Sequence, residues 1–277
     1  MKTLYISDLD GTLLNNNAEL SDTTVEIVNR LIADGLHFSV ATARTAASAD
    51  HILAGLALNL PVVLMNGVLI RDPAEKRYLQ VNTLPPETVR TVAATLKAMG
   101  AAALMYEIRD GEQKTYYESL DRQALRNFVE ARKAKYHKTF TQTDFSSHSG
   151  DSVIYFTLLD RYDVLEPVYD AVKTLPGINA LFYKDSYSAD LWLMEIHSAS
   201  ASKKNGVRLL RETYGFDRVI GFGDNTNDLP MFEACDIKVA VANARPEVLA
   251  AVGRQCGANG ADGVARWIEE DFYAPAP

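Results

Sequence analysis

The sequence predicts an α/β protein whose core is a doubly wound parallel sheet, interrupted by an inserted domain of mixed α+β type. Short apolar segments alternate with helical segments at both ends of the chain, and acidic or hydroxyl motifs directly follow several of these apolar segments. Closely spaced strand patterns replace this alternation in the middle of the chain. We therefore expect residues 1–83 and 191–277 to form the core domain and residues 84–190 to form the insert.

The amino-terminal part of the core is expected to contain three strands and two helices. The first apolar run stops at Asp8, and the first helical pattern stops before Gly35, a residue that commonly ends helices. Strand, helix and strand in alternation imply parallel pairing with right-handed crossovers. In chain order, we expect strand Leu4–Ser7, helix Asp22–Asp34, strand His37–Ala41, helix Ala46–Leu56 and strand Pro61–Met65.

The insert and the second core segment differ in their strand spacing. Asp110-Gly111 separates two strand patterns and predicts a hairpin turn. In the insert we expect helices Pro85–Met99, Leu120–Lys135 and Tyr162–Thr174 and strands Ala102–Ile108, Gln113–Tyr117, Ser152–Leu159, Asn179–Tyr183 and Leu191–Ile196, the last of which begins at the expected domain boundary. In the second core segment we expect helix Ser202–Tyr214, strand Arg218–Phe222, helix Leu229–Ala234, strand Ile237–Val241 and helix Val264–Asp271.

Composition excludes several classes of protein. Among the 277 residues, 47% are hydrophobic and 23% charged, as in ordinary globular proteins. The sequence contains no apolar run of the roughly 18 residues that a membrane span needs, and no signal-peptide pattern, so we expect a cytoplasmic protein. A net charge of −8 disfavours a nucleic-acid partner. We expect a monomer or weak homo-oligomer with two reduced cysteines, Cys235 and Cys256.

Two acids follow the first expected strand in the segment Asp8-Leu9-Asp10-Gly11-Thr12. A carboxylate can attack phosphorus to give an acyl phosphate, and a neighbouring acid can move the proton. A divalent cation between the carboxylate and an anionic substrate would remove their repulsion. The alternative is a pair of loop or capping aspartates beside a glycine turn.

A hydroxyl and two basic groups are candidates for binding phosphate. Thr42 and Arg44 follow the second expected strand, where a hydroxyl and helix-opening amides can seat an anion, although Thr42 could equally be a plain helix N-cap. Lys203 follows the strand that ends at Ile196 and could pair with phosphate as a point charge. The alternatives are a solvated surface lysine, or its neighbour Lys204 in that role.

A second acidic motif, Gly223-Asp224-Asn225-Thr226-Asn227-Asp228, follows the strand Arg218–Phe222. Asp224 and Asp228 can lie on one side of a helix start and offer the hard oxygen ligands that Mg²⁺ prefers. The alternative is an Asx-rich turn that caps a helix. A metal is favoured because these acids, close to Asp8 and Asp10, would repel one another without a cation.

Together these motifs resemble the haloacid dehalogenase superfamily, specifically its Cof-type phosphatases with a type IIB (C2) cap, over nearly the whole chain. The matching segments are Asp8–Leu14, Ala41–Arg44, Asn66-Gly67, Ser202–Asn205, Gly223–Phe232, Asn243-Ala244 and Asp262–Val264. The chain departs from the family where Lys204 replaces the usual glycine after the motif lysine. Aligning this segment on the family pattern favours Lys203 without excluding Lys204.

The resemblance implies a role for each matched residue. Asp8 would be the nucleophile and Asp10 the acid/base. Mg²⁺ would be bound by Asp8, the backbone carbonyl of Asp10 and Asp224, with Asp228 as a further ligand or as a support behind them. The residues expected to bind the phosphate or line its site are Thr42, Arg44, Asn66, Lys203 and Asn227.

The insert would be the cap that closes over the substrate. Sugar phosphates are the family's commonest substrates, so a small-molecule phosphate ester is the expected partner. Candidate contacts in the insert are Glu107, Arg109, Tyr117, Lys184 and Tyr187.

Two other functions are compatible with these motifs. One is phosphoryl transfer within a sugar phosphate, as in phosphomutases. The other is a phospho-accepting or ligand-binding module without turnover. The second acid, Asp10, favours turnover, because hydrolysis of an acyl phosphate needs a base.

Overall fold

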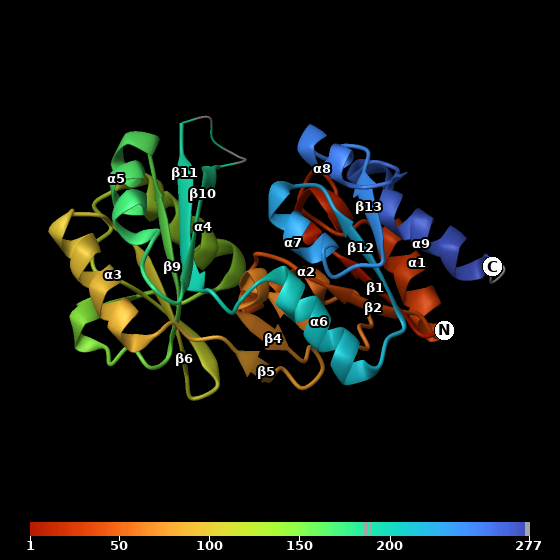
Figure 1. Ribbon diagram of the computed structural model, residues 1–277, viewed down its shortest axis with the longest axis horizontal. Coiled ribbons are helices and arrows are strands. Elements are labelled where there is room, and N and C mark those ends of the chain that lie inside the picture. Colours follow the sequence, from red (N-terminus) through yellow and green to blue (C-terminus); the bar gives the residue numbers. More distant parts are fainter. Residues whose placement is uncertain (186–187, 189, 275–277) are drawn as a thin grey trace. The chain divides into compact units, whose positions relative to one another are not determined.

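The computed structural model describes residues 1–185, 188 and 190–274 and divides into two compact units (Figure 1). Unit 1 comprises Met1–Gln80 and Ser202–Pro277, and unit 2 comprises Val81–Ala201. No helix in the described part of the chain is long and apolar enough to span a bilayer.

Unit 1 is built on a five-stranded parallel sheet with the order β14-β13-β12-β1-β2. Its strands are β1 (Thr3–Ser7), β2 (His37–Val40), β12 (Arg218–Gly223), β13 (Ile237–Val241) and β14 (Arg254–Cys256). In β1, which lies between β2 and β12, Ser7 pairs with Val40 on one side and Phe222 on the other. The loops after β1, β2 and β12 therefore leave the sheet at the same edge.

Helices cover both faces of this sheet, which explains why its strands are short and almost entirely apolar (Figure 1). Helix α1 packs against α9, and helix α6 packs against α7. The helices of unit 1 are α1 (Asp22–Ala33), α2 (Ala46–Leu53), α6 (Lys203–Tyr214), α7 (Leu229–Phe232), α8 (Pro246–Ala251) and α9 (Gly263–Tyr273). The predicted doubly wound core is thus confirmed.

The third expected strand is shorter and differently paired than the sequence suggested. β3 (Val62–Leu64) joins β2 only through a parallel bridge between Ala41 and Val63, and it pairs mainly with β4 (Leu69–Arg71). With β5 (Tyr78–Val81), these strands form a separate three-stranded sheet. The strand ends early because the next residues, Met65 and Asn66, have positive φ angles of 49° and 55°.

Unit 2 contains a six-stranded, largely antiparallel sheet with the order β10-β11-β9-β6-β7-β8. Its strands are β6 (Leu104–Arg109), β7 (Glu112–Tyr117), β8 (Thr141–Gln142), β9 (Val153–Asp160), β10 (Ile178–Lys184) and β11 (Trp192–Ser198). Its helices are α3 (Pro86–Ala98), α4 (Gln123–Tyr136) and α5 (Tyr162–Val172). The predicted α+β insert is present, with its hairpin at Asp110-Gly111.

The two faces of the unit 2 sheet differ in chemistry. One face carries apolar side chains such as Met105, Phe156 and Met194, which form the core with α3 and α5. By register the other face carries Tyr106, Tyr155, Glu195 and other polar residues, and α4 packs against β9 there.

The expected domain boundary at residue 191 lies too early, because the strand that follows it belongs to the antiparallel sheet of unit 2. β11 pairs with β9 and β10, and unit 1 resumes only at Ser202, eleven residues after the expected boundary at residue 191. The alternation of Met194 and Ile196 with Glu195 and His197 is typical of an antiparallel strand with one apolar face. That pattern, rather than the overall apolarity of the segment, identifies its sheet.

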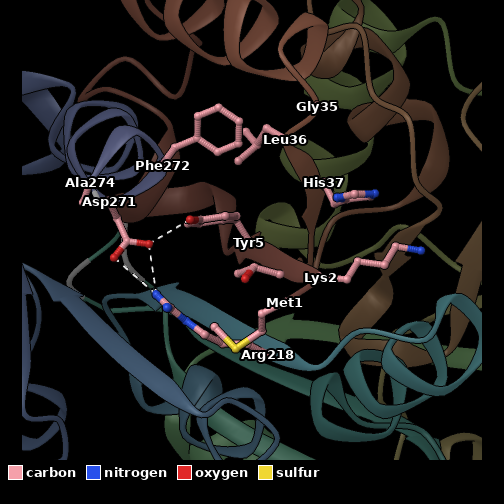
Figure 2. Close-up of a pocket in the computed structure, with 11 residues that line it drawn as sticks. Met1, Lys2, Tyr5, Gly35, Leu36, His37, Arg218, Asp271, Phe272 and Ala274 are labelled. Atoms are coloured by element: carbon pink, nitrogen blue, oxygen red, sulfur yellow. Dashed lines mark hydrogen bonds and ion pairs between the residues drawn. The ribbon is translucent and has the colours of Figure 1, made fainter. Parts of the chain in front are cut away.

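A cavity of about 360 Å³ lies at the amino ends of β1, β2 and β12 (Figure 2). Its wall contains a network in which the hydroxyl of Tyr5 donates to Asp271 (2.8 Å) and Arg218 pairs with the same carboxylate (3.0 Å). This network ties α9 to the sheet. It lies at the edge of the sheet opposite to the one that carries the acidic motifs.

Candidate active site

Asp8 leaves the carboxyl end of β1 in the middle of the sheet. Its backbone N–H donates to the carbonyl of Phe222 (2.9 Å), which ties the first acidic motif to β12. The following turn (Leu9–Leu13) contains Gly11 at φ +76°, and a Cβ there would lie 2.5 Å from Oδ2 of Asp224. Glycine therefore allows the two acidic motifs to approach each other.

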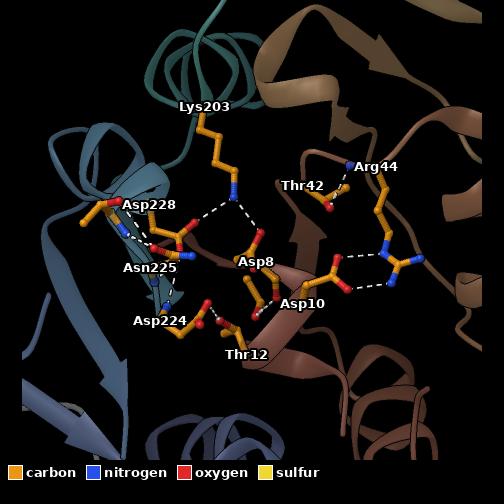
Figure 3. A network of polar contacts seen from close by, with 11 residues as sticks. Asp8, Asp10, Thr12, Thr42, Arg44, Lys203, Asp224, Asn225 and Asp228 are labelled. Atoms are coloured by element: carbon orange, nitrogen blue, oxygen red, sulfur yellow. Dashed lines mark hydrogen bonds and ion pairs between the residues drawn. The ribbon is translucent and has the colours of Figure 1, made fainter. Parts of the chain in front are cut away.

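Lys203 links both motifs from the first residue of α6 (Figure 3). Its Nζ lies 2.6 Å from Oδ1 of Asp8 and 2.7 Å from Oδ1 of Asp228, and all three side chains are buried. Burial alone lowers the pKa of Lys203, but attraction by Asp228 and Asp8 outweighs it and raises that pKa above its usual value. The lysine is therefore held charged inside the protein.

Asp228 has a structural role as well as a charge. Its Oδ2 accepts the backbone N–H groups of Asp224 (3.0 Å) and Asn225 (3.1 Å), and it forms a capping box with Asn225. The motif is therefore an Asx-rich helix cap, as the alternative interpretation had it. The same cap also places the buried carboxylate of Asp228 against Lys203. Asp224 accepts a hydrogen bond from the hydroxyl of Thr12 (3.0 Å).

Three carboxylates form a group that could hold a cation. Asp8, Asp224 and Asp228 each place an oxygen within 4.8 Å of the others. Burial, followed by repulsion from Asp228, raises the pKa of Asp8 well above its usual range and that of Asp224 to about 6. A hard cation relieves such repulsion, and carboxylate oxygens are ligands that Mg²⁺ accepts, so this donor set fits the metal. The side chain of Asp10 is outside the group.

Thr42 and Arg44 lie in the loop after β2. The hydroxyl of the buried Thr42 accepts the backbone N–H of Arg44 (3.1 Å). Thr42 is not the N-cap of α2, because Thr45 occupies that position. Arg44 binds Asp10 through two nitrogens, with Nε to Oδ2 at 2.7 Å and Nη2 to Oδ1 at 2.5 Å.

Asn66 lies in a tight loop beside Thr42. Its backbone N–H donates to the carbonyl of Thr42 (3.0 Å), its side chain is buried, and its Oδ1 has no hydrogen-bond partner among residues 1–185, 188 and 190–274. A Cβ at the next residue, Gly67, would lie 2.2 Å from the carbonyl oxygen of Ser202. The loop therefore needs glycine to pass next to the start of α6.

Two expected residues lie apart from this network. Lys204 pairs with Glu233 at the surface, so the geometry favours Lys203 as the lysine of the site. Asn227 is exposed in the turn Thr226–Asp228, and no described contact brings it into the network, so its role stays a prediction.

Four supporting residues were not identified from the sequence. Thr12 binds Asp224, Asn225 completes the cap, Ser48 accepts from Arg44 (2.9 Å), and Asn243 donates to the carbonyl of Gly11 (2.8 Å). Thr12 and Asn225 lie inside the acidic motifs and Asn243 lies in the matching segment Asn243-Ala244, so each had a signal in the sequence although no contact was assigned to it. Ser48 carried no such signal, because its role depends on the direction of one arginine side chain.

The candidate contacts in unit 2 have different environments. Glu107 is fully buried, 2.9 Å from Nδ1 of His148 and 3.0 Å from Arg109, so it serves the interior of its own unit. Arg109 and Lys184 are exposed, and Tyr117 is half-buried. Tyr187 lies outside the described residues.

Comparison with known proteins agrees with this geometry. Residues 5–268 match the profile of a family described as haloacid dehalogenase-like hydrolase. The chain is 26% identical over 274 residues to 5-amino-6-(5-phospho-D-ribitylamino)uracil phosphatase YitU of Bacillus subtilis, covering 97% of each chain. It is 25% identical to pyridoxal phosphate phosphatase YbhA of Escherichia coli, covering 94% of this chain and 95% of that protein.

A solved structure shows the same fold along the whole chain. A haloacid dehalogenase-like hydrolase from Bacteroides thetaiotaomicron is similar with a TM-score of 0.82 and 25% identity, covering 98% of this chain and all of the other. The core, the insert and their order are therefore those of this family. That the relatives are named phosphatases agrees with the prediction of a phosphoric monoester hydrolase.

Proposed function

The chain belongs to the haloacid dehalogenase-like hydrolases, and we propose that it hydrolyses small-molecule phosphate monoesters through an aspartyl phosphate on Asp8. The observation that carries this proposal is the placement of Asp8. It is a buried carboxylate at the end of the interior strand β1, bound by Lys203 and grouped with Asp224 and Asp228. An anionic phosphate group can approach such a carboxylate only if nearby cations offset the repulsion between the two negative charges.

The first half of the reaction transfers the phosphoryl group to the protein. Lys203 and Thr42 bind the phosphoryl oxygens, and an oxygen of Asp8 attacks phosphorus. A bond from Asp8 to phosphorus forms as the bond from phosphorus to the ester oxygen breaks. Asp10 gives its proton to that oxygen, and the alcohol leaves.

The second half releases phosphate. Asp10, now ionised, takes a proton from a water molecule that attacks the phosphorus of the aspartyl phosphate. The bond between phosphorus and Asp8 breaks, which restores the Asp8 carboxylate and yields inorganic phosphate. Asp10 ends the cycle protonated, as it began.

Mg²⁺ is the cofactor we propose for this site. Asp8, Asp224 and the backbone carbonyl of Asp10 would hold it, with Asp228 supporting them, since both oxygens of Asp228 already accept hydrogen bonds. When bound, the ion offsets the negative charge that gathers around phosphorus. Among the described residues, the three carboxylates of Asp8, Asp224 and Asp228 form ion pairs with one cation, Lys203, which leaves two negative charges for a dication.

The proposed substrate is a phosphate ester of a sugar, polyol or similar small metabolite. The relatives named above act on a ribityl phosphate and on pyridoxal phosphate. These different substrates support small phosphate esters as the substrate class but do not identify one compound. We further propose that unit 2 (Val81–Ala201) selects the leaving alcohol, as a cap does. A cytoplasmic monomer or weak homo-oligomer remains the expectation from the sequence.

Phosphate release from a panel of sugar, polyol, nucleotide and cofactor phosphates tests the proposal, with and without Mg²⁺. The test variant is Asp8→Asn, and the matched control is Asp163→Asn, the same change at an exposed position in α5. We expect Asp8→Asn to lose at least about 10⁴-fold in rate, because an amide is not a nucleophile. An unchanged rate would refute the mechanism, and an isomerised phosphate ester as product would indicate a mutase.

A further inference from the structure

The side chain of Asp10 binds an arginine and is not part of the cluster formed by Asp8, Asp224 and Asp228. Both of its oxygens accept hydrogen bonds from the guanidinium of Arg44, at 2.7 Å from Nε and 2.5 Å from Nη2 (Figure 3). Such a two-point pair fixes the plane of the carboxylate as well as its distance. The pair connects the loop after β1 to the loop after β2.

Arg44 is itself fixed at both ends of its side chain. Its Nη1 donates to the hydroxyl of the buried Ser48 (2.9 Å) in α2. Its backbone N–H donates to Thr42, and its backbone carbonyl accepts the N–H of Met65 (3.1 Å). The direction of the guanidinium therefore follows from the fold.

The pair leaves Asp10 able to move a proton. A carboxylate oxygen can accept two hydrogen bonds, and Arg44 occupies one position on each oxygen. The side chain of Asp10 is 39% exposed, whereas that of Arg44 is 16% exposed. The remaining positions of Asp10 are therefore those that can meet a leaving group or a water molecule.

We infer that Arg44 is a positioning residue that orients Asp10 for proton transfer, and that its main role is not to bind the phosphoryl group. The inference rests on the proposed function, in which Asp10 is the acid and then the base. It departs from the sequence-based expectation of Arg44 as a phosphate ligand. The planar fork of arginine is required, because a lysine offers a single charged point and cannot hold both oxygens.

The two roles predict different substrate dependence. An alkyl phosphate has a poorly leaving alkoxide and needs the proton from Asp10, whereas an aryl phosphate such as p-nitrophenyl phosphate leaves without it. In the first half of the reaction a residue that acts through Asp10 therefore affects alkyl phosphates far more than aryl phosphates, whereas hydrolysis of the aspartyl phosphate is affected equally for both. A residue that binds the phosphoryl group affects both classes equally, because the phosphoryl group is the same.

The first experiment measures kcat and KM of Arg44→Lys and Thr42→Val with an alkyl and an aryl phosphate. For Arg44→Lys we expect kcat/KM, which covers the steps up to departure of the leaving group, to fall about 10²-fold for the alkyl ester and by less than about 5-fold for the aryl ester. Thr42→Val should lower kcat/KM for both esters by the same factor. Ser48→Ala, which removes one support of Arg44 and leaves the pair intact, should show the Arg44→Lys pattern in weaker form.

The second experiment repeats Arg44→Lys in an Asp10→Asn background, with the aryl ester and single-turnover rates. If Arg44 acts through Asp10, the two changes are not additive, and the added loss is less than about 2-fold. Full additivity, or an equal loss for both esters in the first experiment, would overturn the inference while the phosphatase assignment stands. A wild-type protein that cleaves neither ester would refute the proposed function and this inference with it.

Discussion

The two units bury acidic side chains in different ways. At the carboxyl edge of the parallel sheet in unit 1, Asp228 is fully buried, and its oxygens bind Lys203 and two backbone N–H groups. On the polar face of the sheet in unit 2, Glu195 is also buried, yet its Oε2 lacks a hydrogen-bond partner in the described part of the chain. The tyrosine hydroxyls of Tyr183 and Tyr155 only partly offset the burial, and the pKa of Glu195 is raised.

Sheet architecture explains the difference. Loops and helix starts gather at the carboxyl edge of a parallel sheet, so free N–H groups and charged side chains from distant segments meet there. Within an antiparallel sheet the backbone groups are used by the ladder, and a buried acid depends on side chains alone. A buried acid in unit 1 can therefore use backbone donors, whereas Glu195 and Glu107 in unit 2 depend on neighbouring side chains.

The largest effect on stability is expected from Lys203→Met. The change leaves Asp8 and Asp228 buried without their cation, so we expect a loss of about 3–5 kcal/mol in the unfolding free energy of the metal-free protein. The matched control is Lys204→Met, which breaks only a surface pair with Glu233 and should cost no more than about 1 kcal/mol. Urea unfolding in the presence of a chelator measures both, and equal losses would contradict the account.

A smaller effect of opposite sign is expected from Asp224→Asn. Burial and repulsion by Asp228 raise the pKa of Asp224 to about 6, so its ionised form destabilises the metal-free protein increasingly as pH rises from about 4 to above 6. The amide should therefore stabilise the metal-free protein by about 2 kcal/mol at pH 7.5 and by less at pH 5. Thermal unfolding at both pH values tests the sign.

The same variant separates stability from metal binding. Mg²⁺ should raise the melting temperature of the wild-type protein at pH 7.5 but not that of Asp224→Asn, because one ligand is lost. If the variant is less stable than the wild type without metal, Asp224 is not destabilised by repulsion from its neighbours. If the variant keeps the full response to Mg²⁺, Asp224 is not a ligand of the metal.

The smallest effect is expected from Glu195→Gln in unit 2. Burial already disfavours the ionised form of Glu195, so the neutral amide should change stability at pH 7.5 by about 1 kcal/mol or less. The response of the melting temperature to Mg²⁺ should not change. A loss of several kcal/mol, as expected for Lys203→Met, would erase the contrast between the two units.

Much of unit 1 could be predicted because its chemistry follows its strands in sequence order. Asp8, Thr42 and Asp224 each stand just after an apolar run, and parallel strands bring such positions to one edge. The glycine after the first two acids was visible, although the reason for it, the close approach of Asp224 to Gly11, requires coordinates.

The rest could not be read from sequence because it depends on side-chain directions and on sheet membership. Nothing local shows that Arg44 turns toward Asp10, or that Lys203 rather than Lys204 enters the interior. The expected boundary at residue 191 separates β11 from the antiparallel sheet to which it belongs, because a domain boundary has no sequence pattern of its own. Short or unusual elements, such as β14 and the loop at Asn66, carry too few residues for a pattern.

The most direct test of the account is to locate the covalent intermediate. The Asp10→Asn variant should accumulate it, because the base that activates water is missing. After a single turnover with an aryl phosphate labelled in its phosphoryl group and an acid quench, the account predicts label on the peptide that contains Asp8. No label, or label on any other residue while phosphate is still released, would contradict it.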